Sequence, residues 1–174
     1  MLSRPPLPGA LCGALVLSLG SALLACDPNL PPAVEIGTGE IAFVPIEDDD
    51  TLEIIQGPQG GFHLLTSVRV HGIAPGDRGD LTEPTNPTLT LDVTGNDGDS
   101  WIAIGPITQG LDASPLSERP FTHQMTGRFA ILDILADDEL AGQSVDLSVH
   151  IAAEDGIELS DSVRLDLVPH PDNF

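Results

Sequence analysis

The sequence predicts an all-β fold, a sandwich or barrel of about seven to nine strands that follows a helical signal segment. Two observations carry this prediction. Apolar and polar residues alternate with a period of two through most of the chain after residue 33, and Gly, Asp, Asn and Pro clusters separate the alternating runs. No helical period of useful length is present after residue 25.

The first 25 residues have the pattern of an export signal. Arg4 and the terminal amine supply positive charge, Leu11 to Leu24 forms an apolar run, and Ala25 is a small residue at its end. The run is shorter than the roughly 20 residues that cross a bilayer as a helix. A cleaved signal is therefore favoured over a permanent transmembrane helix.

The residues that end this segment, Leu23-Leu24-Ala25-Cys26, resemble the lipobox of bacterial lipoproteins. The resemblance implies that the signal is cut between Ala25 and Cys26, that Cys26 carries acyl chains, and that its membrane partner is the lipid of the cell envelope. We expect the outer membrane or the cell surface rather than the inner membrane. The alternative is ordinary signal cleavage, with Cys26 as an unmodified residue. Cys12 leaves with the signal, so the mature chain forms no internal disulfide.

The mature chain is strongly acidic. All 27 acidic residues but only five arginines follow Ala25, which gives a net charge of −22, and the chain contains no lysine. A field of this sign repels phosphate backbones, so nucleic acid is excluded as a partner.

A short proline-rich tether, Asp27–Ala33, precedes the predicted domain and reaches about 20 Å. The domain itself is expected over residues 34–169, with a tail at 170–174. Its predicted strands are Val34–Gly37, Glu40–Ile46, Thr51–Gln56, Phe62–Ile73, Thr88–Thr94, Trp101–Ile107, one or two strands within Phe121–Ile134, Ser144–Ala152 and Ile157–Val168.

Alternation within these strands predicts which side chains form the core. Phe62, Leu64, Thr66, Val68 and Val70 share one face of the clearest strand in the first half. The inward residues of the other strands are expected to be Leu89, Leu91, Val93, Phe129, Ile131 and the residues around Leu132, Val145, Leu147, Val149, Ile151, Ile157, Leu159, Val163, Leu165 and Leu167.

Asp161 is the exception on the apolar face of the last predicted strand. Burying an unpaired carboxylate is costly, so a bulge or local exposure is expected there.

Two further resemblances concern the domain. The last hairpin, with Leu140-Ala141-Gly142 before it, resembles the last two strands of bacterial immunoglobulin-like modules, which implies an immunoglobulin-like antiparallel β-sandwich. The segments Glu35–Glu40 and Gly57–His63 resemble a pattern in uncharacterised lipoproteins of myxobacteria and related deltaproteobacteria. This second resemblance implies an envelope setting and no activity.

Calcium is the one cofactor for which the sequence offers candidates. Two turns are rich in oxygen ligands, at Glu47–Asp50 and Asn96–Asp99, and extracellular modules hold Ca²⁺ weakly through such groups. Neither turn has the spacing of an EF-hand, and Asp and Asn are also common turn residues. The candidate ligands are Asp48, Asp49, Asp50, Asp97 and Asp99.

No catalytic pattern is found in the sequence. It lacks G-x-S-x-G, H-E-x-x-H and a phosphate loop, and its histidines have no zinc-type spacing. His63 and His71 are about 26 Å apart along one strand. His63 is of interest because it follows a Gly-Gly turn that can bring backbone close to a partner. We therefore expect a non-catalytic envelope lipoprotein that acts as a structural or protein-interaction module, with binding of Ca²⁺ or another ligand as the alternative.

Overall fold

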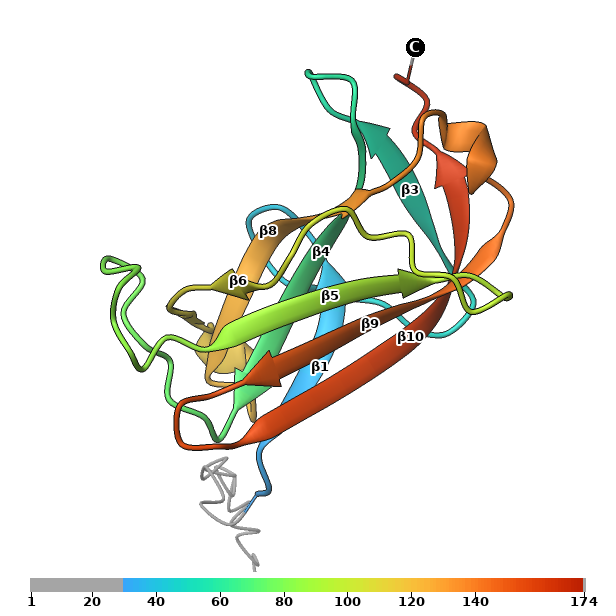
Figure 1. Ribbon diagram of the computed structural model, residues 1–174. Helices are drawn as coiled ribbons and strands as arrows, with labels where there is room; N and C mark the ends of the chain where they lie inside the picture. The colour runs from blue at the N-terminus through green and yellow to red at the C-terminus, as the bar shows by residue number, and fades with distance from the viewer. Residues whose placement is uncertain (1–29, 174) are drawn as a thin grey trace, which may run out of the picture.

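The computed structural model describes residues 30–173, and these residues confirm the all-β prediction. Within them lie ten strands and two short 3₁₀ helices (Figure 1). The elements are β1 (Ala33–Thr38), β2 (Val44–Pro45), β3 (Asp50–Gln56), β4 (Phe62–His71), β5 (Thr88–Thr94), β6 (Ile107–Thr108), β7 (Asp112–Ala113), η1 (Leu116–Glu118), β8 (His123–Leu132), η2 (Asp137–Glu139), β9 (Ser144–Ala152) and β10 (Glu158–Pro169).

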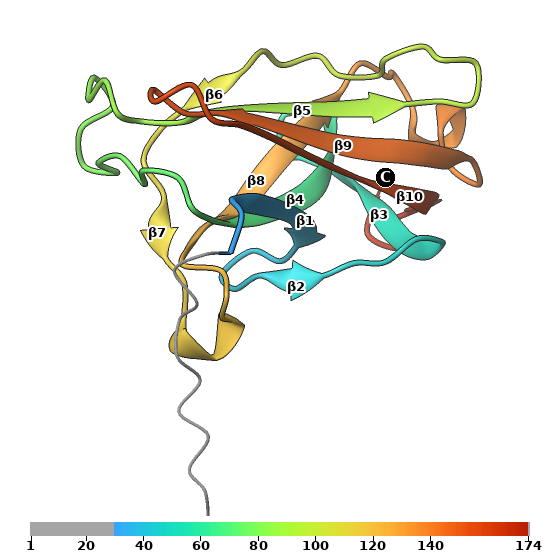
Figure 2. The same ribbon diagram turned by 90° about the horizontal axis from the view of Figure 1, so that it is seen from below.

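The strands form two layers, which Figure 2 shows one above the other. We call the layer with the order β2-β1-β4-β8-β7 sheet A. Sheet B has the order β3-β10-β9-β5-β6. The β4–β8 and β9–β10 pairings are the longest of their sheets.

Strand β3 belongs to both layers. Its first five residues, Asp50–Ile54, pair in parallel with the end of β10, and its last two, Ile55 and Gln56, pair with the start of β4. The β3–β10 pairing is therefore parallel, and all other pairings between named strands are antiparallel. A strand that changes sheets is one way in which a sandwich closes its side.

The core lies between the sheets and follows the predicted alternation. Ile54, Leu64, Val70, Leu147 and Leu165 are fully buried, and each alternates with a more exposed neighbour. Burial of such side chains stabilises the fold by about 1.5–3 kcal/mol each.

Two predicted strands are much shorter in the structure. Only Val44–Pro45 of the expected strand at 40–46 pairs with β1. The segment predicted as the strand Trp101–Ile107 instead crosses between the layers: Trp101 N–H donates to Val93 O of sheet B, and Ala103 N–H donates to Ile131 O of sheet A. The sequence does not reveal such a crossing, because Trp101 to Ile104 are all apolar and give no alternation.

The prediction that Phe129 and Ile131 are core residues is wrong. They are 49% and 38% exposed on the outer face of sheet A, while Ala130 and Leu132 point inward. A bulge in β8 lies opposite Ser67, where the β4–β8 register shifts. Both residue pairs are apolar, so the sequence of β8 does not distinguish the two faces.

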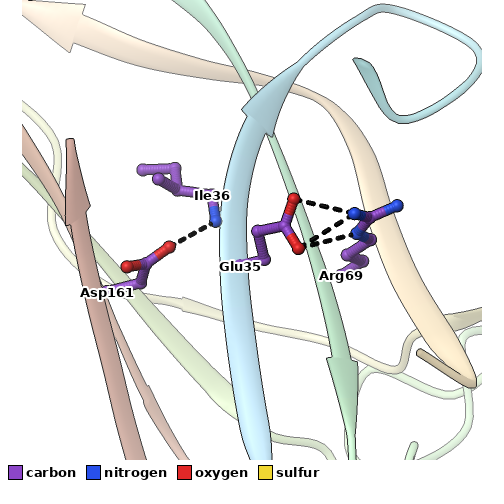
Figure 3. A network of polar contacts seen from close by, with 4 residues as sticks. All are labelled: Glu35, Ile36, Arg69 and Asp161. Atoms are coloured by element: carbon purple, nitrogen blue, oxygen red, sulfur yellow. Dashed lines mark hydrogen bonds and ion pairs between the residues drawn. The ribbon is translucent and has the colours of Figure 1, made fainter. Parts of the chain in front are cut away.

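Asp161 lies in a continuous β9–β10 register, so the expected bulge is absent at this position. Its side chain is half-buried, and Oδ2 accepts a hydrogen bond of 2.9 Å from the backbone N–H of Ile36 in β1 (Figure 3). Oδ1 accepts a second one from Ser162 N–H. The carboxylate is therefore satisfied, and it joins sheet B to β1 of sheet A.

Both ends of the domain are held more tightly than expected. Pro32 already lies against Gly72, where an added Cβ would come within 2.8 Å of its Cα. At the other end Asn173 Nδ2 donates to Ile54 O, and Asn173 Oδ1 accepts from Gln56 N–H. The fixed part of the chain thus begins before β1 and continues past β10.

Candidate functional site

The predicted lipidation and cleavage residues, Ala25 and Cys26, lie outside the described residues 30–173. Within residues 30–173, no helix has the length and hydropathy that a membrane crossing requires.

The acidic turn at Glu47–Asp50 uses its carboxylates to bind its own backbone and that of β10. Asp48 Oδ1 accepts from Arg164 N–H at 2.9 Å, and Asp50 Oδ2 accepts from Glu47 N–H at 2.8 Å. Asp49 has a φ of 69°, the left-handed conformation that Asp tolerates in turns. These residues therefore have a structural explanation in the turn itself.

The second acidic turn lies near the first, because Arg164 contacts both. Arg164 Nη2 donates to Asn96 Oδ1 at 2.9 Å. Asp97 Oδ1 accepts from Asp99 N–H within the turn. Across the described part of the chain, no group of three or more His, Cys, Asp or Glu side chains is placed to hold a metal ion. The calcium candidates are thus not assembled into one site.

The outer face of sheet B carries a shallow polar hollow of about 540 Å³, lined by Thr90, Asp92, Ser148, His150, Ser160, Ser162 and parts of Val149 and Asp161. Its side chains form cross-strand rows, because Thr90 and Ser160 both lie opposite His150, one on each side. His150 Nδ1 is 3.0 Å from Ser160 Oγ. The hollow offers hydroxyl, imidazole and carboxylate groups, which suits a ligand rich in hydrogen-bonding groups.

The outer face of sheet A carries a contiguous apolar surface, which we call the apolar block. Register places its members in direct contact: Leu65 lies opposite Phe129, and His63 lies opposite Ile131. The row through His63 extends on both sides, to Ile55 on β3 and to the exposed Ala103 after β5. The apolar block consists of Ile55, His63, Leu65, Ala103, Phe129 and Ile131.

His63 is an aromatic member of the apolar block. Its ring centroid lies 4.3 Å from that of Phe129, in a tilted arrangement. Burial lowers the pKa of His63 below the usual histidine value, because the charged form loses hydration. The lowered pKa favours the neutral imidazole, which adds apolar ring surface to the block.

An acidic hollow of about 260 Å³ lies at one end of the apolar block. Asp99, Ser100, Trp101 and Asp133 line it. Asp133 N–H donates to Trp101 O, which aligns these residues with the Ala103–Ile131 row. Two carboxylates beside an indole ring form a surface that favours a cation.

The other end of the apolar block is closed by an arginine held between two aromatic rings. The Arg69 guanidinium lies 4.3 Å from the centre of Phe43 and 4.5 Å from that of Phe121. It also forms a two-pronged ion pair with Glu35, in which Nη2 donates to Oε1 at 2.8 Å and Nε donates to Oε2 at 3.2 Å; Figure 3 shows it beside the Asp161 contact. This cluster is already satisfied, so the open apolar surface ends at it.

Sequence reasoning missed the apolar block because its members come from β3, β4, β8 and the segment after β5. The sequence analysis singled out His63 because of the Gly-Gly turn before it, whereas in the structure His63 is a member of the apolar block. It lies next to an exposed aromatic residue, and the Gly-Gly turn before it is not the decisive feature.

Comparisons with known proteins add little to this geometry. No protein-family model matches the chain, and none of the curated proteins matches it. Among solved structures, the chain is similar to the crystal structure of CopC from Methylosinus trichosporium OB3b at 14% identity and a TM-score of 0.32. That alignment covers 74% of this chain and 91% of the other. Residue roles do not transfer at this level of similarity.

Proposed function

We propose that this protein is a non-catalytic interaction module of the cell envelope, anchored through acyl chains on Cys26, that binds a partner protein through the apolar block. The apolar block carries this proposal. Phe129 is half exposed, beside the exposed Ile131, on a surface that no other element covers within the described residues. Contiguous exposed apolar surface of this kind marks interaction sites, and exposed aromatic side chains dominate the energetics of such contacts.

The electrostatics of the surface define the partner's chemistry. The acidic hollow of Asp99, Trp101 and Asp133 adjoins the apolar block, and the mature chain carries a charge of −22. A partner segment with apolar side chains and one flanking Lys or Arg complements both features. The anchor supports this arrangement, because a tethered domain meets envelope partners at high effective concentration.

A non-catalytic role is supported by the openness of the polar hollow. The His150–Ser160 contact resembles part of a catalytic pair, but the hollow is shallow and open to solvent. Catalysis requires preorganised dipoles in a site from which water is excluded.

Site-specific photo-crosslinking tests the proposed interface in the native envelope. A photoreactive side chain at position 129 is expected to capture a defined protein, and one at position 81 is not. Leu81 is the matched control because it is 69% exposed and lies in the loop between β4 and β5, outside the apolar block and the acidic hollow. The adduct should weaken when Asp133→Asn and Asp99→Asn remove the acidic hollow. Equal capture at both positions would disprove the interface.

The anchor requires its own test. Labelled fatty acid should enter the natural chain and not the Cys26→Ala variant, which should also remain unprocessed or leave the membrane. Incorporation into both would show that the label is not attached to Cys26.

Binding of a polar ligand in the hollow of sheet B is the second candidate function. The cross-strand rows of hydroxyl and carboxylate groups around His150 favour it. A polyol or Ca²⁺ bound only to the native state would raise the melting temperature, and Ser148→Leu would abolish that rise. An unchanged melt at millimolar ligand would exclude this candidate.

A further inference from the structure

The described chain enters the sandwich at one end, together with several loops. Ala33 pairs with His71 at the end of β4, and Pro32 lies against Gly72. Because β1 lies beside the start of β10, with Ile36 bonded to Asp161, the β9–β10 turn is at this same end. Figure 1 shows the β9–β10 turn and the described start of β1 together at the lower side of the molecule. We call this the entry end.

The distance between Cys26 and the fixed part of the chain is short. Five residues, 27–31, separate Cys26 from Pro32, and at about 3.1 Å per residue they reach roughly 15–20 Å. An anchor on Cys26 therefore holds the entry end within that distance of the lipid, while the strands lead the opposite end away.

Three exposed leucines lie in segments that leave or join the sandwich at the entry end, where Thr88 pairs with Ala152 and Thr122 N–H donates to Val70 O. Leu30 precedes β1, Leu81 lies in the loop between β4 and β5, and Leu116 lies in η1 before β8. Their exposed fractions are 44%, 69% and 79%. Single exposed leucines are ordinary on a protein surface. Three from different segments give this end more exposed apolar surface than a single leucine would.

The charges at the entry end limit the kind of surface it can meet. Exposed acids outnumber exposed arginines there: Asp77, Asp80, Glu154, Asp155 and Glu158 are exposed, against Arg78 and Arg119, and Arg78 already pairs with Asp112. Anionic headgroups repel such a surface, whereas zwitterionic headgroups do not.

From the tether length and these side chains we infer that the entry end rests on a zwitterionic lipid surface, with Leu81 and Leu116 in the headgroup region. This inference depends on the proposed anchor at Cys26. It gives the domain one orientation: the strands lead away from the lipid, and the apolar block faces sideways, where a neighbouring envelope protein can reach it.

Tryptophan quenching by brominated phosphatidylcholine tests the orientation on the full, processed protein in vesicles. Trp101→Phe removes the natural tryptophan, and Leu81→Trp, Leu116→Trp or Leu135→Trp then places a single reporter. Position 135 is the matched control, since it is a fully exposed leucine at the opposite end. Quenching is expected at positions 81 and 116 and not at 135, with each variant melting at the temperature of its Trp101→Phe parent.

The outcomes separate the orientation from the anchor. If the protein floats with vesicles but quenching at 81 and 116 equals that at 135, the orientation is wrong and the anchor stands. If the protein does not float, the anchor fails and the orientation fails with it. Quenching at 81 and 116 should decrease in phosphatidylglycerol vesicles at low salt, and equal quenching in both lipids would overturn the zwitterionic assignment.

Discussion

Replacing Asp161 by alanine tests whether one carboxylate joins the two sheets at the β1 edge. Asp161 Oδ2 accepts from Ile36 N–H at 2.9 Å, and Ile36 is only 2% exposed. The alanine side chain leaves this backbone donor without a partner and without access to water. Leaving a buried donor unsatisfied costs about 1–3 kcal/mol, and a hydrogen bond to a charged group contributes about 1.5–3 kcal/mol.

Removing the carboxylate also relieves part of its desolvation cost, so the two contributions do not simply add. We expect Asp161→Ala to lower the free energy of unfolding by about 2–3 kcal/mol. Asp161→Asn keeps an acceptor oxygen and should cost about 1 kcal/mol. The control, Glu158→Ala, changes an exposed carboxylate on the same strand and should stay within about 0.5 kcal/mol of the natural protein.

Urea unfolding of the mature chain, with Cys26→Ser to remove lipid, measures these free energies. Hydrogen exchange gives a local readout, because the Ile36 amide should lose protection in Asp161→Ala more than amides in the middle of sheet A. A loss below about 0.5 kcal/mol for Asp161→Ala, the level of an ordinary surface change, would refute the inter-sheet role. So would equal losses for the alanine and asparagine variants.

Three further predictions use the same unfolding measurement. Gly127→Ala should lower the free energy of unfolding by about 2–3 kcal/mol, because φ is 65° and an added Cβ would come within 2.7 Å of Glu40 O. The control, Gly60→Ala, has a φ of 87° but open space around it and should cost about 1 kcal/mol. Equal losses in the two variants would contradict the steric reasoning. Burial lowers the pKa of His63, so between the unfolded and folded pKa values the unfolded chain binds more protons and stability is lost as the pH falls. The natural protein should therefore lose stability relative to His63→Phe between about pH 7.5 and pH 5.5, and a constant difference would show that His63 does not contribute. Arg69→Lys should cost about 1–2 kcal/mol, since lysine cannot keep both ring contacts and the ion pair made by two nitrogens, Nε and Nη2, and an unchanged midpoint would refute this.

Much of the core could be predicted from local alternation. The inward residues of β4, β5 and β9 were correctly identified, because a strand with one face in a core shows the period of two in its own sequence. The same reasoning failed in β8, where Phe129 and Ile131 are outside and Ala130 and Leu132 inside. Both sets are apolar, and only pairing with β4 across the bulge decides between them.

Asp161 illustrates the same limit for polar residues. The sequence identified it as an exception on an apolar face, but the partner that explains it, the amide of Ile36, lies 125 residues away. Neither a bulge nor full exposure is needed once that donor is supplied by another sheet. Long-range pairing of this kind has no local signature.

The sequence by itself determined the strand periodicity, the acidic charge, and the signal and lipobox pattern, because each of these depends on neighbouring residues or on composition alone. Only the tertiary structure decided which apolar residues remain exposed and which acidic turns share an end. The apolar block requires three separate strands and a crossing segment to meet, and the entry end requires β1, β4 and β10 to be in register. These meetings are set by pairing between residues far apart in the chain, and that pairing decides which surface can bind.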